Sequence, residues 1–162
     1  MSVAAAYIDT SAFLRLFIDE GDSDETWEIV RGMLRLFASR LVLTEARVTL
    51  ARMRRGNRLS EEDYHTALQS VLAFWDDEVV CCPLTEDVHR AADGLAPELA
   101  LRSADALHLG AALEIRRTLP DDLPFGFIAF DHDLLKAAAA LRFTPLPSPG
   151  TPVFSRCHGF GT

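Results

Sequence analysis

The segment Leu101–Arg117, LRSADALHLGAALEIRR, decides how the rest of this chain is interpreted. Its apolar residues recur at helical spacing, which predicts a buried helix, and Ser103 is of a type that caps helix N-termini. These apolar residues are Ala104, Leu107, Ala111 and Ile115. Asp105 lies in the first turn, with His108 one turn further along the same side. Because an unpaired carboxylate is costly to desolvate, such a helix should keep Asp105 only where water, a partner or a cation meets it.

Three other hydrophobic runs also end on an acid. AAAYID ends at Asp9, RLVLTE ends at Glu45, and FGFIAFD ends at Asp131. Ligands of parallel sheets bind at the carboxyl ends of the strands, so these three acids are expected at that edge, with Asp105 facing it. The four acids therefore predict one shared acidic site.

Length and composition favour a single globular domain. The chain has 162 residues, 49% of them hydrophobic, which is enough to bury a full core. Neither a membrane-length apolar run nor a signal peptide is evident, so we expect a cytoplasmic protein that contacts no membrane. Its 3 cysteines include no CxxC spacing, which argues against a disulfide framework or a zinc knuckle. We assign residues 1–146 to the domain and 147–162 to a tail rich in Pro and Gly.

The formal net charge of -8 argues against a chain that holds nucleic acid by bulk attraction. It does not exclude a nuclease, because divalent cations offset the charge of metal-binding carboxylates locally. One stretch concentrates basic side chains, namely Arg47, Arg52, Arg54 and Arg55. This run is interpreted either as a solvated helix face or as a surface for RNA phosphates or an acidic partner segment.

Hydrophobic periodicity predicts strands that alternate with helices. The expected strands are Ala4–Ile8, Arg40–Thr44, Glu78–Pro83, Phe125–Phe130 and an edge strand at Phe143–Leu146. Parallel neighbours need helical crossovers, so this alternation predicts an α/β sandwich with a mostly parallel sheet of four to five strands.

Capping residues and prolines set the expected helix boundaries. A helical stripe spans Trp27–Phe37, and another helix is expected over Glu45–Gly56. Ser60 and Thr85 should cap the next two helices, and Pro97 should end the second of them. The helices on either side of Ser60 are expected to form a projecting hairpin with surplus apolar surface, which suits a protein interface.

Each acid taken alone has an ordinary explanation, because Asp and Glu favour helix N-termini. Several carboxylates in one crevice repel each other, however, unless a cation lies among them. Oxygen ligands select hard cations, so the sequence favours Mg²⁺ or Mn²⁺ over zinc.

Four segments carry a family resemblance: YIDTSAFLRLFIDE, LTEARVTLAR, SADALHLGAAL and FDHDLLKAA. In order and spacing they resemble the four acidic motifs of PIN-domain nucleases, especially the VapC-type toxins of type II toxin–antitoxin systems. The resemblance runs from about Tyr7 to Leu146 and implies a PIN-like three-layer sandwich with helices on both faces of the sheet. It places the family's catalytic acids at Asp9, Glu45, Asp105 and Asp131.

The resemblance also implies metal-dependent hydrolysis of RNA. Asp9, Asp105 and Asp131 would hold Mg²⁺ or Mn²⁺, and Glu45 would complete the shell or orient the attacking water. Thr10 or Ser11 would supply a hydroxyl that helps to hold the first acid. Asp133 resembles the extra downstream acid of some members, although it also suits a helix cap. His108 is interpreted as a satisfied interior histidine rather than a base.

The expected partners follow from the same family: an RNA substrate, a cognate antitoxin that blocks the acidic cleft, and a second copy in a homodimer. Two alternatives stay open. One is a PIN nuclease that processes RNA without an antitoxin, and the other is a non-catalytic module in which the acids hold a metal or cap helices.

Overall fold

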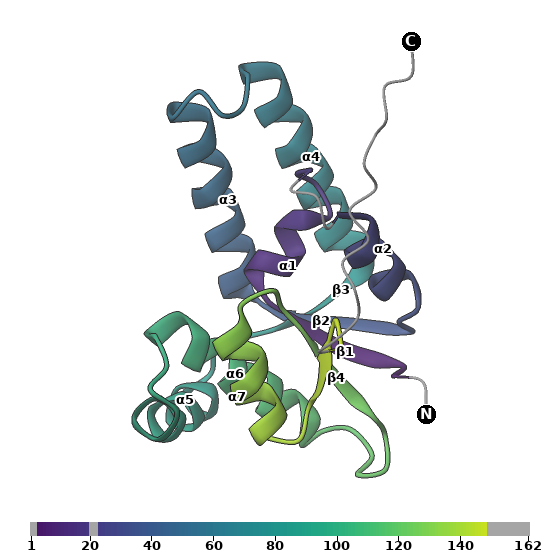
Figure 1. Cartoon of the computed structure of the whole chain (residues 1–162), viewed down its shortest axis with the longest axis vertical. Helices are drawn as coiled ribbons and strands as arrows, with labels where there is room; N and C mark the ends of the chain where they lie inside the picture. The colour runs from purple at the N-terminus through teal and green to yellow at the C-terminus, as the bar shows by residue number, and fades with distance from the viewer. Residues whose placement is uncertain (1–2, 20–22, 149–162) are drawn as a thin grey trace.

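The computed structural model describes residues 3–19 and 23–148, which form a sheet between two layers of helices (Figure 1). Within these residues the strand order is β3-β2-β1-β4-β5, and every pairing is parallel. The strands are β1 (Ala5–Ile8), β2 (Arg35–Ser39), β3 (Val79–Cys82), β4 (Phe125–Ile128) and β5 (Thr144–Leu146). The predicted fold class, including the last edge strand, is confirmed.

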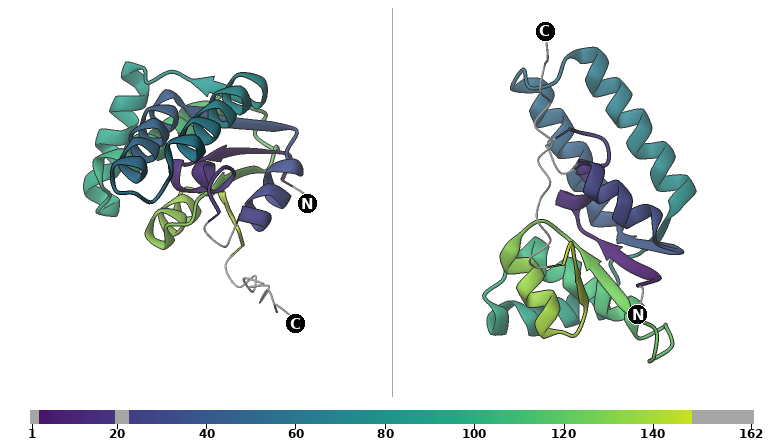
Figure 2. Two further views of the ribbon diagram at one scale, coloured as in Figure 1. Left: turned by 90° about the horizontal axis from the view of Figure 1, so that it is seen from above. Right: turned by 45° about the vertical axis from the view of Figure 1, so that its right-hand side comes forward.

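The helices divide between the two faces of the sheet (Figure 2). One face packs against α1 (Thr10–Arg15), α2 (Ser23–Arg31), α3 (Arg40–Arg55) and α4 (Glu61–Glu78). The other packs against α5 (Glu86–Leu99), α6 (Ser103–Arg116) and α7 (His132–Ala140). Two hydrophobic cores result, one on each side of the sheet.

Strand β1 shows why both faces are needed. Ala6 and Ile8 contribute to the core beneath α1–α4, whereas Ala5 and Tyr7 contribute to the core beneath α5–α7. All four side chains are buried. A parallel strand covered on both faces reads as a continuous apolar run, and this is the pattern that located it in the sequence.

Helices α3 and α4 form the predicted projecting hairpin, seen at the top of Figure 1. Arg54 ties the two helices together, because its Nη1 lies 3.1 Å from Glu61 Oε1 and its guanidinium lies 4.3 Å from the centre of the Tyr64 ring. The Ser60 cap is confirmed, since its Oγ accepts a hydrogen bond from the Asp63 amide.

The predicted second strand at Arg40–Thr44 is wrong, and the helical stripe predicted at Trp27–Phe37 is correct only as far as Arg31, where α2 ends. The strand lies one segment earlier, at β2, and Arg40 begins α3. Leu34 had matched a helical apolar stripe, but it is 86% exposed, and α2 ends at Arg31 just before Gly32. Short apolar runs fit a strand or a buried helix equally well by periodicity.

Three other predicted boundaries also change. Ser103 is the first residue of α6 rather than its cap, and Arg102 holds the cap position without a side-chain hydrogen bond. Pro97 lies inside α5, which continues to Leu99 and ends at Ala100 in the left-handed conformation. Strand β4 ends at Ile128 rather than at Phe130. The Thr85 cap is confirmed.

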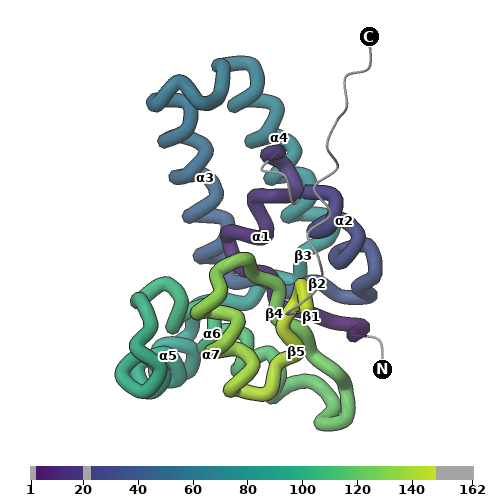
Figure 3. Tube along the Cα trace, viewed as in Figure 1, coloured from purple at the N-terminus to yellow at the C-terminus, as the bar shows by residue number. Residues whose placement is uncertain are grey.

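The Cα trace in Figure 3 shows β5 beside β4 at the end of the described chain. Most of the predicted tail, 147–162, lies outside the described residues. In the ranges that are described, every helix is too short or too polar to cross a membrane.

Gly110 sets the distance between α5 and α6. A Cβ at this position would lie 2.7 Å from the carbonyl oxygen of Val88 and 3.1 Å from the amide of Ala92, both backbone atoms of α5. We expect Gly110→Ala to lower the free energy of unfolding by roughly 1–3 kcal/mol, because the two helices must separate. Urea unfolding measures this change.

Gly94, in α5, is the matched control, because a Cβ there meets nothing within 4 Å. Gly94→Ala should stabilise the protein by about 0.5–1 kcal/mol through helix propensity alone. Equal stabilisation by both substitutions would show that the two helices are not in close contact at Gly110.

Candidate active site

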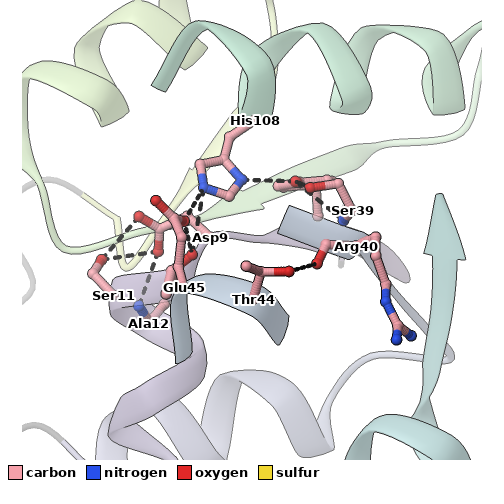
Figure 4. A network of polar contacts seen from close by, with 10 residues as sticks. Asp9, Ser11, Ala12, Ser39, Arg40, Thr44, Glu45 and His108 are labelled. Carbon is pink, nitrogen blue, oxygen red and sulfur yellow. Dashed lines mark hydrogen bonds and ion pairs between the residues drawn. The ribbon is translucent and has the colours of Figure 1, made fainter. Parts of the chain in front are cut away.

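Asp9 lies where β1 ends and α1 begins, and it is 5% exposed. Its backbone amide donates to the carbonyl of Ile128 at 3.0 Å, which continues the pairing of β1 with β4. Its carboxylate caps α1 by accepting from the Ala12 amide at 2.9 Å, and Ser11 Oγ lies 2.8 and 2.9 Å from its two oxygens (Figure 4). Local backbone geometry therefore fixes this acid in place.

Burial raises the pKa of Asp9 to about 6, even though the Ala12 amide, His108 and Ser11 act to lower it. Asp105 adds to the rise as a neighbouring negative charge. Desolvation thus outweighs the hydrogen bonds, and the ionised form of this carboxylate lacks full compensation inside the protein.

Asp105 lies in the first turn of α6 and is half-buried. Burial raises the pKa of its carboxyl group, and the charge of Asp131 raises it further. Glu45 acts in the same direction, whereas His108 and Arg102 oppose the shift. The structure therefore brings the four predicted acids into one electrostatically coupled neighbourhood.

Asp131 and Asp133 both lie at the start of α7. Asp131 caps this helix, since its Oδ1 accepts from the Leu134 amide at 2.9 Å, and its side chain is exposed. Asp133 is an exposed acid in the first turn. Both line a cleft of about 540 Å³ together with Asp105. The capping and site interpretations are therefore compatible for Asp131.

Glu45 does not end a strand, which corrects the position expected for it. It lies in the second turn of α3, half-buried, and reaches the site from there. His108 Nε2 is 2.9 Å from its Oε2, and Thr10 donates a short hydrogen bond to the same oxygen. Although burial acts to raise the pKa of Glu45, the hydrogen bonds of His108 and Thr10 lower it below its usual value.

Thr10 and Ser11, expected as alternatives for one role, bond to different acids. Ser11 contacts Asp9, and Thr10 contacts Glu45. The two hydroxyls follow Asp9 by one and two residues, so the turn into α1 orients two carboxylates at once.

His108 is a satisfied interior histidine, as expected. It is 3% exposed, and its Nδ1 lies 2.9 Å from the hydroxyl of Tyr7 while Nε2 faces Glu45. One sequence feature indicates this position, because His108 follows Asp105 by one helical turn. No sequence feature indicates the contact with Tyr7, since the two residues lie 101 positions apart along the chain.

Two basic residues that the sequence analysis did not select also line the cleft. They are Arg102, at the start of α6, and Lys136, on α7. The remaining wall is partly apolar, with Leu101, Leu134 and Ala137 among its residues. The predicted set on α3 (Arg47, Arg52, Arg54 and Arg55) does not contribute to this lining.

The donor chemistry of the acids suits a hard divalent cation. The carboxylates of Asp9, Asp105 and Asp131 would supply oxygen ligands to such a cation. The charge repulsion that adds to burial in raising the pKa of Asp105 is of the kind a cation relieves. In the conformation described for residues 3–19 and 23–148, no three His, Cys, Asp or Glu side chains already form a metal-binding group. Mg²⁺ retains several waters when it binds to proteins, so it does not require a complete protein shell.

Comparison with known proteins places this geometry in a family. The family model described as PIN domain matches residues 6–140. Ribonuclease VapC47 of Mycobacterium tuberculosis (strain CDC 1551 / Oshkosh) is 32% identical over 146 residues, which cover 89% of this chain and 96% of that protein. Ribonuclease VapC49 of Mycobacterium tuberculosis (strain ATCC 25618 / H37Rv) is 35% identical over 109 residues, covering 67% and 75%.

Two solved structures share the fold. One is VapC20 of Mycobacterium tuberculosis, described as a toxin that cleaves the sarcin–ricin loop. It aligns with a TM-score of 0.55 and 17% identity, over 85% of this chain and 95% of its own. PAE2754 from Pyrobaculum aerophilum aligns with a TM-score of 0.53 and 22% identity, over 85% of this chain and 81% of its own. Because the family model spans most of the sequence and VapC47 matches over nearly its full length, the chain belongs to the PIN-domain family, among its VapC-type proteins.

Proposed function

We propose that this protein is a metal-dependent endoribonuclease and the toxin of a type II toxin–antitoxin pair. The main support is the electrostatic coupling of Asp9, Glu45, Asp105 and Asp131 at the carboxyl edge of the sheet. The relatives VapC47 and VapC49 are named ribonucleases, and VapC20 is described as a toxin that cleaves the sarcin–ricin loop. An RNA substrate also supports the expected cytoplasmic location.

Asp9, Asp105 and Asp131 would hold Mg²⁺ or Mn²⁺, with Ser11 keeping the Asp9 carboxylate in orientation. When bound, such a cation supplies Lewis-acid activation of the phosphodiester and of the attacking water. Glu45 stays ionised because the hydrogen bonds of His108 and Thr10 lower its pKa, so it would orient that water as a hydrogen-bond acceptor. Asp133 lines the same cleft and would add one negative charge beside the proposed metal ligands.

The cleft beside Asp105 has the composition of a nucleotide-binding surface. Arg102 and Lys136 can contact the phosphates that flank the scissile bond, and the apolar wall suits a ribose or a base. Because acids line the same cleft, these two cations would bind a phosphate best once a divalent cation offsets the carboxylates.

A second surface suits the antitoxin. A groove of about 870 Å³ runs between α4 and the segment that follows α1, with apolar walls that include Phe17, Trp27 and Phe74. Asp63 and Asp77 also line it, so an apolar segment with basic side chains would fit. We assign this groove to the antitoxin.

The α3 arginines stay candidates for contacts with RNA or the antitoxin. Arg47, Arg52 and Arg55 are exposed, whereas Arg54 is already engaged with Glu61. The exposed Val48 lies on the same helix, and the homodimer interface expected from the family stays a proposal for this surface.

Replacing Asp105 with Asn tests the nuclease directly. The wild-type protein should cut structured cellular RNA in the presence of Mn²⁺ or Mg²⁺, and EDTA should stop the cleavage. Asp105→Asn should lower the cleavage rate by about 100-fold or more, because a charged metal ligand is lost. Gel analysis of the RNA measures the rate. Asp121→Asn, an exposed acid in the loop before β4, is the charge-matched control. Undiminished cutting by Asp105→Asn would place the active site elsewhere.

Replacing Asp9 with Asn should stabilise the chelator-treated protein at pH 7. The folded-state pKa of Asp9, about 6, lies above its ordinary value of 3.8, so the folded state favours the neutral group. The stability gained by protonation is complete below about pH 4 and is lost as the pH rises through 6. Asn mimics the neutral form, so the gain at pH 7 is on the order of 3 kcal/mol.

Urea unfolding at pH 4 to 7 measures this difference, which should shrink toward pH 4. Mn²⁺ should stabilise the wild type but not Asp9→Asn. Destabilisation by Asp9→Asn at pH 7 would contradict the conclusion that burial outweighs the hydrogen bonds of this carboxylate.

Replacing Lys136 with Gln tests the RNA cleft. If Lys136 contacts one phosphate, the slope of log affinity against log salt should fall by about 0.7 for single-stranded RNA. Fluorescence anisotropy with an oligonucleotide in Mn²⁺ measures affinity. Glu45→Gln is present in both arms to slow cleavage, because it leaves the three proposed metal ligands intact. Arg90→Gln, on the surface of α5 and paired with Asp87, should leave the slope unchanged. If Arg90→Gln lowered the slope and Lys136→Gln did not, the RNA would bind along α5 and not in the cleft.

A further inference from the structure

The buried imidazole of His108 lies directly beside Glu45 and favours its ionised form, but the proposed chemistry does not yet say what this contact does to the position of the carboxylate. His108 bonds through both ring nitrogens, to Glu45 Oε2 at 2.9 Å and to Tyr7 Oη at 2.9 Å. Figure 4 shows the ring between the Glu45 carboxylate on one side and the Ser39 region on the other. The ring therefore connects α6 with α3 and β1.

Tyr7 gives the imidazole a rigid support. Its side chain is fully buried and stacks on Phe127 with the ring centres 5.4 Å apart. Its hydroxyl accepts from the Ser39 amide at 3.2 Å and lies 2.9 Å from Ser39 Oγ. This contact also explains why Ser39, at the cap position of α3, makes no side-chain cap: its hydroxyl is engaged with Tyr7. The His108 ring cannot rotate without losing hydrogen bonds on both sides.

The imidazole and Thr10 leave one Glu45 oxygen available. An ionised carboxylate only accepts hydrogen bonds, so His108 Nε2 is the donor in this pair. Oε2 receives both donors, and within the described part of the chain Oε1 takes part in no hydrogen bond. The pair thus fixes the carboxylate in one orientation with a single free oxygen.

The place where this network ends favours a functional role over a purely structural one. A fully satisfied buried polar network rigidifies a core wherever it lies. Here the network runs from Ser39 through Tyr7 and His108 and ends on a half-buried acid of the candidate site. Glu45 is therefore the end of the network that reaches solvent, and it is also the group that would face the substrate.

We propose that His108 is a positioning residue for the nuclease reaction: it holds Glu45 so that Oε1 faces the attacking water, and Tyr7 fixes the imidazole. This inference rests on the proposed function. His108 itself touches neither substrate nor cation and acts through Glu45. The effect of losing it must therefore depend on the presence of the Glu45 carboxylate.

A double-mutant cycle between His108 and Glu45 tests this dependence. His108→Leu should lower kcat on structured RNA by about 10- to 100-fold with little change in KM, as expected when an interaction used in the transition state is lost. In a Glu45→Gln background the same substitution should have no further effect. His108→Gln, which restores a side-chain donor, should recover part of kcat.

Two further measurements separate positioning from general damage. Tyr7→Phe keeps the ring stack and removes the hydroxyl, so it should lower kcat less than His108→Leu does. If His108→Leu fails to fold, Tyr7→Phe alone tests whether support of the imidazole affects kcat. Mn²⁺ affinity measured by calorimetry should stay unchanged in both variants. In ¹⁵N NMR, the His108 Nε2 signal should shift on Glu45→Gln and keep its position on the control substitution Asp121→Asn.

Full kcat in a folded His108→Leu protein would overturn the proposal, as would an equal loss in the Glu45→Gln background. A wild-type protein that cuts no RNA with Mn²⁺ or Mg²⁺ would instead refute the proposed function. The NMR comparison would still decide whether His108 holds Glu45, because it does not depend on cleavage.

Discussion

The carboxylate buried between β1 and α1 is the constraint on which the rest of the site depends. Asp9 cannot move away from the sheet, because its amide continues the β1–β4 pairing and its side chain caps α1. It also cannot be ionised at low cost, because desolvation outweighs the hydrogen bonds of Ser11 and Ala12. A fold that keeps such a group buried needs positive charge nearby. The neighbouring acids meet this need if, together with Asp9, they bind a divalent cation.

The structure gives chemically similar acids different properties. The pKa values of Asp9 and Asp105 are raised, first by burial, so both carboxylates gain most from a bound cation. The pKa of Glu45 is lowered, because His108 and Thr10 outweigh its burial, so Glu45 stays ionised without one. Environments that separate pKa values in this way are how active sites assign roles to equivalent side chains. These opposite shifts support the proposal that the first two acids hold the cation and that the third orients the attacking water.

The sequence predicts local features of this protein better than its long-range ones. Asp9 and Asp131 could be found because a buried strand followed by a helix cap leaves a short, readable pattern. The sequence predicts Glu45 from the end of a strand that does not exist. Leu34 and Phe37 fit a helical stripe, so the true strand β2 is missed. The bond between His108 and Tyr7 could not be foreseen, because only the packing of α6 against β1 brings residues 101 positions apart together.

The two surfaces assigned to partners lie on different sides of the molecule, and this constrains how an antitoxin could inhibit the enzyme. The cleft proposed for the substrate is built from the end of α5, the start of α6 and α7. The apolar groove lies along α4, on the opposite face of the sheet. A segment seated only in the groove would leave Asp105 and Asp131 uncovered. An inhibitor that blocks cleavage must therefore extend past the edge of the sheet to reach the acids. The carboxylates there repel acidic groups, so the part that reaches them should present a basic side chain.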